Sequence, residues 1–278
     1  MSKTVWVTGA SSGLGLHTAQ ALRDAGWTVI AGARSFHGEA KDGIHCLPLD
    51  VTDDASVAAF VSEAQRIAPQ VDALVQCAGI LVLGSCEETS LEEYKRVMNT
   101  NFLGMVRMNH AVLPLMRRQG SGRIVMFSSI NGLLGVPFQS AYTAAKHAVE
   151  GYAECLMMET HGMGIQVCLV EPGDHRSGSS AYRAHAKGAQ ATSPYGERYA
   201  STCYVIRRDE TGGSDPDVLG RKVAKALARK HMPFRLRIAK GDQHLAVWLH
   251  DLLLPGLNGR ILRSYYYGKQ DKAAKDGD

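Results

Sequence analysis

Residues 8–15 have the sequence Thr8-Gly9-Ala10-Ser11-Ser12-Gly13-Leu14-Gly15, directly after a short apolar stretch and directly before a helical pattern. Glycine permits backbone turns and close approaches that other residues do not. A helix N-terminus adds free N–H groups and the positive end of the helix dipole, both of which favour a phosphate. A strand, a glycine-rich turn and a helix in this order therefore predict a phosphate-binding loop, although the spacing differs from the usual GxGxxG pattern.

Apolar stretches alternate with helical patterns on the C-terminal side of this loop. Strands are expected at residues 4–8, 27–33, 44–49, 71–77, 123–128 and 165–170, and helices at residues 14–25, 55–67, 91–118 (broken or ended near Pro114) and 141–160. Strands that are apolar throughout indicate a parallel sheet covered on both faces. The expected fold class is α/β: a single Rossmann-type domain over residues 1–278, with a doubly wound parallel sheet and helices on both faces.

The alternation weakens after Pro172-Gly173. Residues 174–215 lack a clear period, which is typical of a substrate lid. Tyr182, Tyr195 and Tyr199 either line the substrate pocket or pack the lid down, and Val136-Pro137-Phe138-Gln139 is a second candidate wall. A helix at 217–230 and a strand at 234–239 follow. The extension at 241–278 contains an apolar helix at 244–254. The segment at 244–267 either covers the core, as we expect, or lies on a membrane.

Composition excludes several classes of protein. The net charge is +4 with scattered basic residues, so no nucleic-acid partner is expected. The six cysteines form no CxxC pair, and we predict no metal site. No apolar segment is long enough to cross a bilayer. We expect a cytoplasmic protein with reduced thiols and without membrane contact.

The second expected strand ends in Ala33-Arg34. In dinucleotide-binding folds, an acidic residue at this point binds the adenosine 2′-hydroxyl of NAD. A guanidinium without such an acid favours the 2′-phosphate of NADP. Arg34 therefore predicts NADP(H) rather than NAD(H). The alternative is that Arg34 is only a surface charge and that NAD(H) binds less selectively.

Tyr142 and Lys146 lie one turn apart on one face of an expected helix. A tyrosine with its ordinary pKa of about 10 is a poor base near neutrality, and a neighbouring ammonium lowers that pKa. Tyr142 is then a candidate to exchange a proton with an alcohol or carbonyl oxygen. Ser129, on the loop after a strand, is a candidate hydrogen-bond donor to the same oxygen, with Ser128 as its rival.

Taken together, residues 8–15, Cys77-Ala78-Gly79, Asn101, Ser129, Tyr142-x-x-x-Lys146 and Pro172-Gly173 resemble the classical short-chain dehydrogenase/reductase family in order and spacing, over roughly residues 3–173. The resemblance implies four catalytic residues, namely Asn101, Ser129, Tyr142 and Lys146. It also implies a cofactor site made by Gly9, Ser11, Ser12, Gly13, Leu14, Gly15, Arg34, Asp50, Val51, Cys77, Ala78, Gly79, Tyr142, Lys146, Pro172 and Gly173.

The same resemblance implies individual roles. Lys146 would hold the nicotinamide ribose, and Asp50 and Val51 would lie at the adenine. Asn101, with Asn99 as its rival, would place a water that links Lys146 to solvent. The family usually has Asn where this chain has Cys77, which puts local rigidity in doubt more than function. A homodimer or homotetramer is implied.

These residues predict hydride transfer between nicotinamide and a secondary alcohol or ketone. A loose resemblance to the hydroxysteroid and retinol dehydrogenase branch implies a lipophilic, steroid- or retinoid-like small molecule. The alternatives are a non-catalytic NADP(H)-binding sensor, and an isomerase or dehydratase on the same fold.

Overall fold

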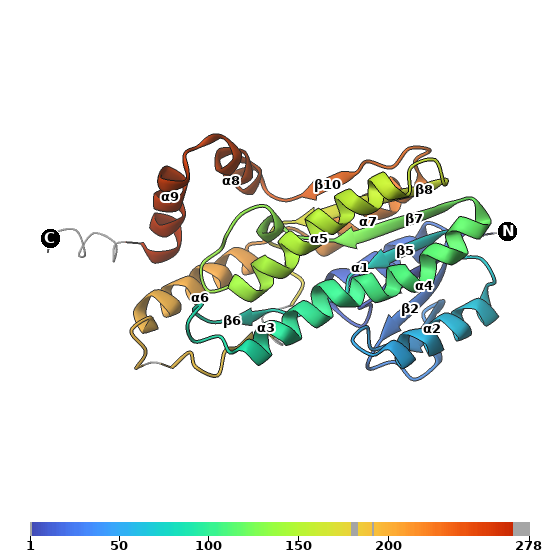
Figure 1. Ribbon diagram of the computed structural model, residues 1–278, viewed down its shortest axis with the longest axis horizontal. Helices are drawn as coiled ribbons and strands as arrows, with labels where there is room; N and C mark the ends of the chain where they lie inside the picture. The colour runs from blue at the N-terminus through green and yellow to red at the C-terminus, as the bar shows by residue number, and fades with distance from the viewer. Residues whose placement is uncertain (1, 179–182, 191, 269–278) are drawn as a thin grey trace, which may run out of the picture.

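The structure is a computed structural model that describes residues 2–178, 183–190 and 192–268. Within these residues an eight-stranded sheet runs through the molecule, with helices against both faces (Figure 1). Its strand order is β10-β8-β7-β5-β1-β2-β4-β3. The strands are β1 (Thr4–Thr8), β2 (Thr28–Ala33), β3 (Glu39–Lys41), β4 (Ile44–Pro48), β5 (Ala73–Gln76), β7 (Gly122–Phe127), β8 (Ile165–Pro172) and β10 (Arg235–Ile238).

The sheet confirms the expected doubly wound arrangement. From β1 the chain proceeds outward through β2 and β4, then returns to β5 and proceeds to the other edge through β7, β8 and β10. All these pairings are parallel. The order therefore reverses between β1 and β5, and in open α/β sheets ligands bind in the crevice at such a switch point.

One edge strand departs from the all-parallel expectation. β3 pairs with β4 in antiparallel fashion, with Lys41 opposite Ile44. The two residues between them, Asp42 and Gly43, both have positive φ (51° and 75°). Asp-Gly is a favoured sequence for a two-residue hairpin turn of this kind, so the local sequence accounts for the reversal.

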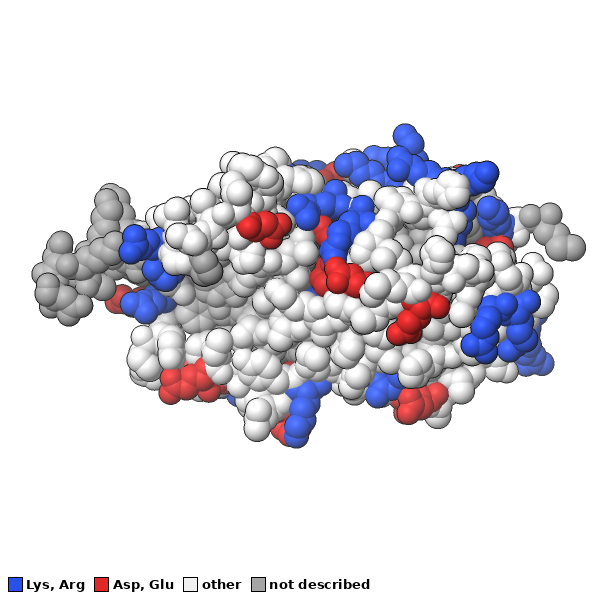
Figure 2. All heavy atoms as spheres, turned by 45° about the horizontal axis from the view of Figure 1, so that its top comes forward, with Lys and Arg blue, Asp and Glu red and all other residues white. Residues whose placement is uncertain are grey.

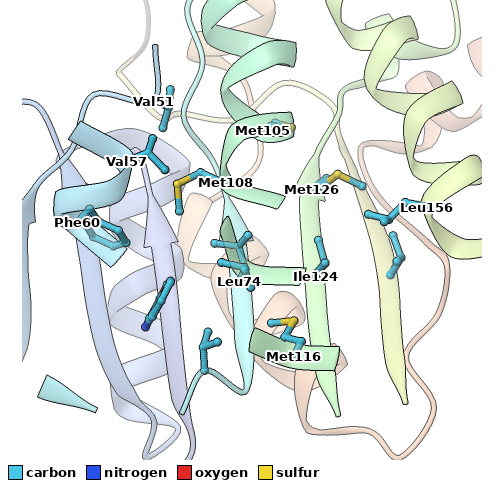
Figure 3. Close-up of a cluster of buried hydrophobic side chains, with 14 of the residues drawn as sticks. Val51, Val57, Phe60, Leu74, Met105, Met108, Met116, Ile124, Met126 and Leu156 are labelled. Atoms are coloured by element: carbon cyan, nitrogen blue, oxygen red, sulfur yellow. The ribbon is translucent and has the colours of Figure 1, made fainter. Parts of the chain in front are cut away.

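The helices form one layer on each face of the sheet. Side chains of neighbouring strand residues point to opposite faces: Trp6 packs with α2, α4 and α5, whereas Val5 and Val7 pack with α1 and α7. Figure 3 shows the first cluster, where Leu74 and Ile124 meet Met108 and Met116 of α4. These helices are α1 (Gly13–Asp24), α2 (Asp54–Ile67), α4 (Gly104–Gln119), α5 (Ser140–Glu159) and α7 (Pro216–Ala228).

The long helix expected at residues 91–118 has a different form. It consists of α3 (Leu91–Met98), a π-helical turn η1 (Asn99–Leu103) and α4, which continues through Pro114. Proline costs a helix one hydrogen bond but leaves those of the flanking turns in place. In η1 the Gly104 N–H bonds to the Asn99 carbonyl, five residues back. This π-helical turn lies near the cleft described below. π-Helical turns are frequent at functional sites.

The expectation of an irregular segment at 174–215 is wrong for its second half. Residues 196–211 form α6 (Gly196–Thr211), and β9 (Ala184–His185) pairs in parallel with β6 (Val82–Leu83). Only Thr202, Val205 and Ile206 of α6 are buried. So narrow an apolar face leaves little helical period in the sequence.

Two further helices, α8 (Gly241–Leu252) and α9 (Pro255–Tyr267), lie beyond β10 at one end of the molecule (Figure 1). They cover the body less completely than expected, because Val247 is buried while Leu245, Trp248 and Leu252 are exposed. On the face in Figure 2, uncharged side chains cover much of this end, and acidic and basic groups are interspersed elsewhere. Of the helices described, none has the length and apolarity needed to cross a membrane.

Candidate active site

A cleft with a volume of about 1110 Å³ lies at the carboxyl ends of the strands. Its walls come from the loops after β1, β2, β4, β5, β7 and β8, together with α5, α6, α8 and α9. The expected cofactor and catalytic residues converge on it. The following line it: Gly9, Ser11, Ser12, Gly13, Leu14, Gly15, Arg34, Asp50, Val51, Cys77, Ala78, Gly79, Ser129, Tyr142, Lys146, Pro172 and Gly173.

The loop after β1 is pressed against the loop after β5. Gly9 has φ +69°, and a Cβ there would lie 2.6 Å from the Cα of Ala78. A Cβ on Gly15 would lie 2.2 Å from the Gly9 carbonyl oxygen. Both positions therefore require glycine. The Ser12 side chain forms no cap on α1 within the described structure, so the N–H groups of the first turn remain available to a phosphate at the cleft.

The end of β2 carries positive charge. Arg34 is exposed and lines the cleft directly after Ala33. Across from it, the carboxylate of Asp50 accepts hydrogen bonds from the N–H and hydroxyl of Thr52, at 2.9 and 2.7 Å. Burial raises the pKa of Asp50, but these bonds and the charges of Arg34 and Arg107 outweigh it and lower the pKa. Asp50 is therefore a carboxylate near neutrality, within the electrostatic reach of Arg34.

Ser129 is held by neighbouring polar groups. Its Oγ accepts a hydrogen bond from the N–H of Asn131 at 3.2 Å. The Asn131 side chain in turn donates to Oε1 of Gln139 at 3.0 Å. All three residues are buried and line the cleft. The Ser129 O–H is directed to the side-chain oxygen of Asn131, at 3.5 Å. Asn131 was not predicted as a site residue, whereas Gln139 belongs to the wall expected at residues 136–139. Local sequence offered no signal for their pairing.

Tyr142 and Lys146 extend from the same face of α5, with Lys146 Nζ 5.5 Å from the centre of the Tyr142 ring. Burial raises the pKa of Tyr142 to about 12, while hydrogen bonding with Ser129 and the charge of Arg183 lower it. The expectation that Lys146 lowers this pKa is therefore not met. Nζ instead donates to the Phe127 carbonyl at 2.5 Å, and burial lowers the pKa of Lys146 to about 8.

Asn101 lies beneath the wall of the cleft rather than on it. Its side chain is fully buried and bonds the backbone of Ile80 in both directions. Its rival Asn99 lines the cleft and accepts a hydrogen bond from Arg107 at 2.8 Å. Both belong to η1. The structure thus places Asn101 where it shapes the wall and Asn99 where it reaches the cleft.

Cys77 stands where the related motifs have asparagine. Burial raises the pKa of its thiol far above the ordinary value. A protonated, buried thiol behaves as a small apolar group. Ala78 and Gly79 still line the cleft beside it.

At the substrate end, Tyr195 and Tyr199 pack edge-to-face against Phe138, in agreement with the alternative that they pack the lid down. Tyr182 lies outside the described residues. Of Val136-Pro137-Phe138-Gln139, Gln139 lines the cleft. The walls here include residues that sequence reasoning missed: Leu134, Asp174, Arg183, Ile206, Glu210, Leu249, Ile261, Tyr265 and Tyr266. The aromatic run at 265–267 was the one available signal.

Comparisons with known proteins agree with this geometry. The sequence model described as short chain dehydrogenase matches residues 3–187. A 3-ketodihydrosphingosine reductase of Bacteroides thetaiotaomicron is 37% identical over 254 residues, covering 90% of this chain and 94% of the relative. Dehydrogenase/reductase SDR family member 7B of Danio rerio is 31% identical over 243 residues, covering 82% of this chain and 75% of the relative. A solved short-chain dehydrogenase from Streptomyces avermitilis has a TM-score of 0.81 at 30% identity, over 100% of both chains.

Proposed function

Because the chain belongs to the short-chain dehydrogenase/reductase family, we propose that it is an NADP(H)-dependent reductase of a lipophilic ketone, with Tyr142 as the proton donor. Membership itself makes the chain an oxidoreductase that acts on CH–OH or carbonyl groups with NAD(P). The observation that carries the proposal is the convergence of Ser129, Tyr142 and Lys146 on one cleft that also contains the glycine loop.

The chemistry follows from the positions of these side chains. The Tyr142 phenol donates its proton to the carbonyl oxygen, and the Ser129 hydroxyl donates a hydrogen bond to the same oxygen as negative charge develops there. The nicotinamide cofactor supplies the hydride when it is bound. In the opposite direction, Tyr142 accepts the proton of the alcohol. Lys146, one turn further along α5, would hold the nicotinamide ribose.

The cofactor would lie along the carboxyl edge of the sheet. The tight packing of Gly9 and Gly15 and the free N–H groups of α1 fit a pyrophosphate. Asp50 and Val51 fit the adenine side, and Pro172 and Gly173 the nicotinamide side. Arg34 supports NADP(H) over NAD(H), because a guanidinium at the end of β2 attracts a 2′-phosphate and the Ala33-Arg34 junction offers no carboxylate to repel it.

The substrate would be lipophilic. Apolar side chains of three helices and of the loop before α5 line the cleft: Leu134, Ile206, Leu249, Ile261 and Leu262. Such walls suit a long or fused hydrocarbon whose ketone reaches Tyr142. A long-chain keto compound is favoured because one relative is a 3-ketodihydrosphingosine reductase. Steroid and retinoid carbonyls remain in the same class. Among the described residues of the lid expected at 174–215, α6 would cover this part of the cleft.

Nicotinamide absorbance, followed over time, tests the proposal. NADPH and NADH are each combined with a 3-ketosphingoid base, a long-chain methyl ketone, a steroid ketone and a retinal. Oxidation of NADPH with one lipophilic class supports the proposal and identifies the class. Turnover with NADH alone would overturn the role of Arg34. Tight NADPH binding without turnover of any carbonyl compound would overturn the proposed reaction.

A further inference from the structure

A buried ion pair lies in the cleft and is not used by the mechanism above. Arg183, directly before β9, donates a hydrogen bond to Glu210 in the last turn of α6. Their side chains are 7% and 18% exposed, and both residues line the same cleft as Tyr142. Burying two charges costs much of what their attraction returns, so such a pair is weak evidence of a stabilising role. Its position suggests an electrostatic one.

The backbone holds Arg183 on the same wall as Tyr142. Ala184 pairs with Val82 in the β6–β9 sheet, and its N–H bonds the Leu81 carbonyl. Two residues after Val82, the N–H of Gly84 bonds the carbonyl of Phe138, which precedes α5. Side chains follow the same connection, because Val82 and Ala184 pack in one apolar cluster with Ala141. Arg183 and Tyr142 are the immediate neighbours of Ala184 and Ala141.

Charges of both signs surround the Tyr142 phenol. On its own helix, Lys146 lies below the ring, and Ser129 approaches from the end of β7. The thiol of Cys77 is protonated and carries no charge. Among the described residues beyond α5 that line the cleft, further ionisable side chains come from five segments: Asp174 and His175 after β8, Arg183 before β9, Asp209 and Glu210 of α6, Asp242 of α8, and Tyr265 and Tyr266 of α9.

Among these groups, the two members of the ion pair act on the phenol with opposite signs. Burial has the largest effect and raises the pKa of Tyr142 to about 12. The charge of Arg183 lowers this pKa, and the charge of Glu210 raises it. The guanidinium therefore stabilises the phenolate form, and the carboxylate opposes it.

We propose that Arg183 is a positioning residue for proton transfer, which stabilises the negative charge on Tyr142 as its O–H bond breaks, and that Glu210 holds the guanidinium in place. This inference rests on the proposed function, in which the Tyr142 proton passes to the substrate oxygen. The hydride from NADPH goes to the carbonyl carbon, the new O–H bond forms on the product, and the phenolate regains a proton from solvent.

The test is the pH dependence of alcohol oxidation by the NADP⁺ complex, with the alcohol of whichever carbonyl compound turns over in the assay above. Oxidation requires the phenolate, so its rate rises with pH through the Tyr142 pKa. Arg183→Gln should move this rise upward by about one pH unit, and Glu210→Gln should move it downward. Arg183→Lys keeps the charge and should restore most of the wild-type profile.

A purely structural pair would give a different result. Both Gln variants would then lower the melting temperature and kcat without moving the pH profile, or would move it in the same direction, and either outcome overturns the proposal. Misfolding of one of the two variants would not move their pH profiles in opposite directions.

If no carbonyl compound turns over, the proposed function fails separately. The pair is then tested by tyrosinate absorbance of the NADP⁺ complex, with each variant compared with its Tyr142→Phe counterpart. A Tyr142 titration that moves upward in Arg183→Gln and downward in Glu210→Gln supports the inference. Identical titration curves in both variants and the wild type overturn it.

Discussion

The side-chain amide of Asn101 exchanges two hydrogen bonds with the backbone of Ile80. Nδ2 donates to the Ile80 carbonyl at 2.8 Å, and Oδ1 accepts from the Ile80 N–H at 2.7 Å. Asn101 belongs to the π turn η1, and Ile80 directly follows the cleft residues 77–79. The pair therefore joins the helix that precedes α4 to the loop on which the cofactor would lie.

Asn101→Ala should destabilise the protein and loosen cofactor binding together. The substitution leaves a backbone donor and acceptor of Ile80 without their partner, at about 1–3 kcal/mol for each buried group. Thermal unfolding, with and without NADPH, measures both effects, and we expect a melting temperature lower by several degrees. Asn99→Ala is the control for the melting temperature, because it removes only one part-buried bond, the one from Arg107. Equal melting temperatures for wild type and Asn101→Ala would contradict this role.

Tyr142→Phe should abolish most turnover while cofactor affinity stays close to that of wild type. Removal of a general acid costs about 100- to 10,000-fold in rate. Steady-state kinetics and NADPH fluorescence titration measure the two quantities. Tyr152→Phe is a matched control on the same helix, since its hydroxyl contacts Asn109 in the core instead of the cleft. Wild-type turnover by Tyr142→Phe would refute the assignment.

Arg34→Ala should weaken NADPH binding far more than NADH binding. Loss of a charge-assisted hydrogen bond to phosphate costs about 1.5–3 kcal/mol, which corresponds to roughly tenfold to a hundredfold in the dissociation constant of NADPH. Calorimetric titration with each cofactor gives the ratio. Arg66→Ala, on the exposed surface of α2, is the control for a change in net charge. A parallel loss for both cofactors would rule out contact with the 2′-phosphate.

Asp174→Asn should stabilise the protein above pH 6. Burial and the nearby carboxylates of Asp209 and Glu210 raise the pKa of Asp174 from 3.8 to about 6. Between these values the unfolded chain loses its proton before the folded chain does, so stability falls as pH rises through this window and stays reduced above it. The asparagine side chain of the variant has no carboxyl group to ionise, so the variant does not lose this stability as the pH rises. The amide oxygen can still accept a hydrogen bond from Gln243.

Denaturant unfolding at about pH 4 and pH 7.5 measures the difference, which we expect on the order of 1–2 kcal/mol at the higher pH after solvent screening. Asp242→Asn, at the exposed start of α8, is the control and should follow the wild-type pH dependence. A variant no more stable than wild type at the higher pH would contradict the prediction.

Local features of the chain were predictable because their causes are local. The glycine loop, the strand after it and the Tyr142–Lys146 pair depend on residues within one or two turns of each other. The Asp42-Gly43 hairpin was not predicted, because a three-residue exposed strand has too little apolar pattern to be recognised. The expectation that the helix breaks or ends near Pro114 was wrong, because the effect of a proline on a helix depends on the packing around it. Helix α4 continues through Pro114.

The sequence by itself determined most of the strands and helices up to residue 170, the glycine turn and the spacing of Ser129, Tyr142 and Lys146, because hydrophobic period and backbone preference act over short distances. The tertiary structure alone decided which distant groups face Tyr142. Arg183 and Glu210 meet there because β9 pairs with β6 and α6 folds over the cleft. It likewise decided that burial raises the pKa of Tyr142, since desolvation and charge depend on distances through space, which no spacing along the chain encodes.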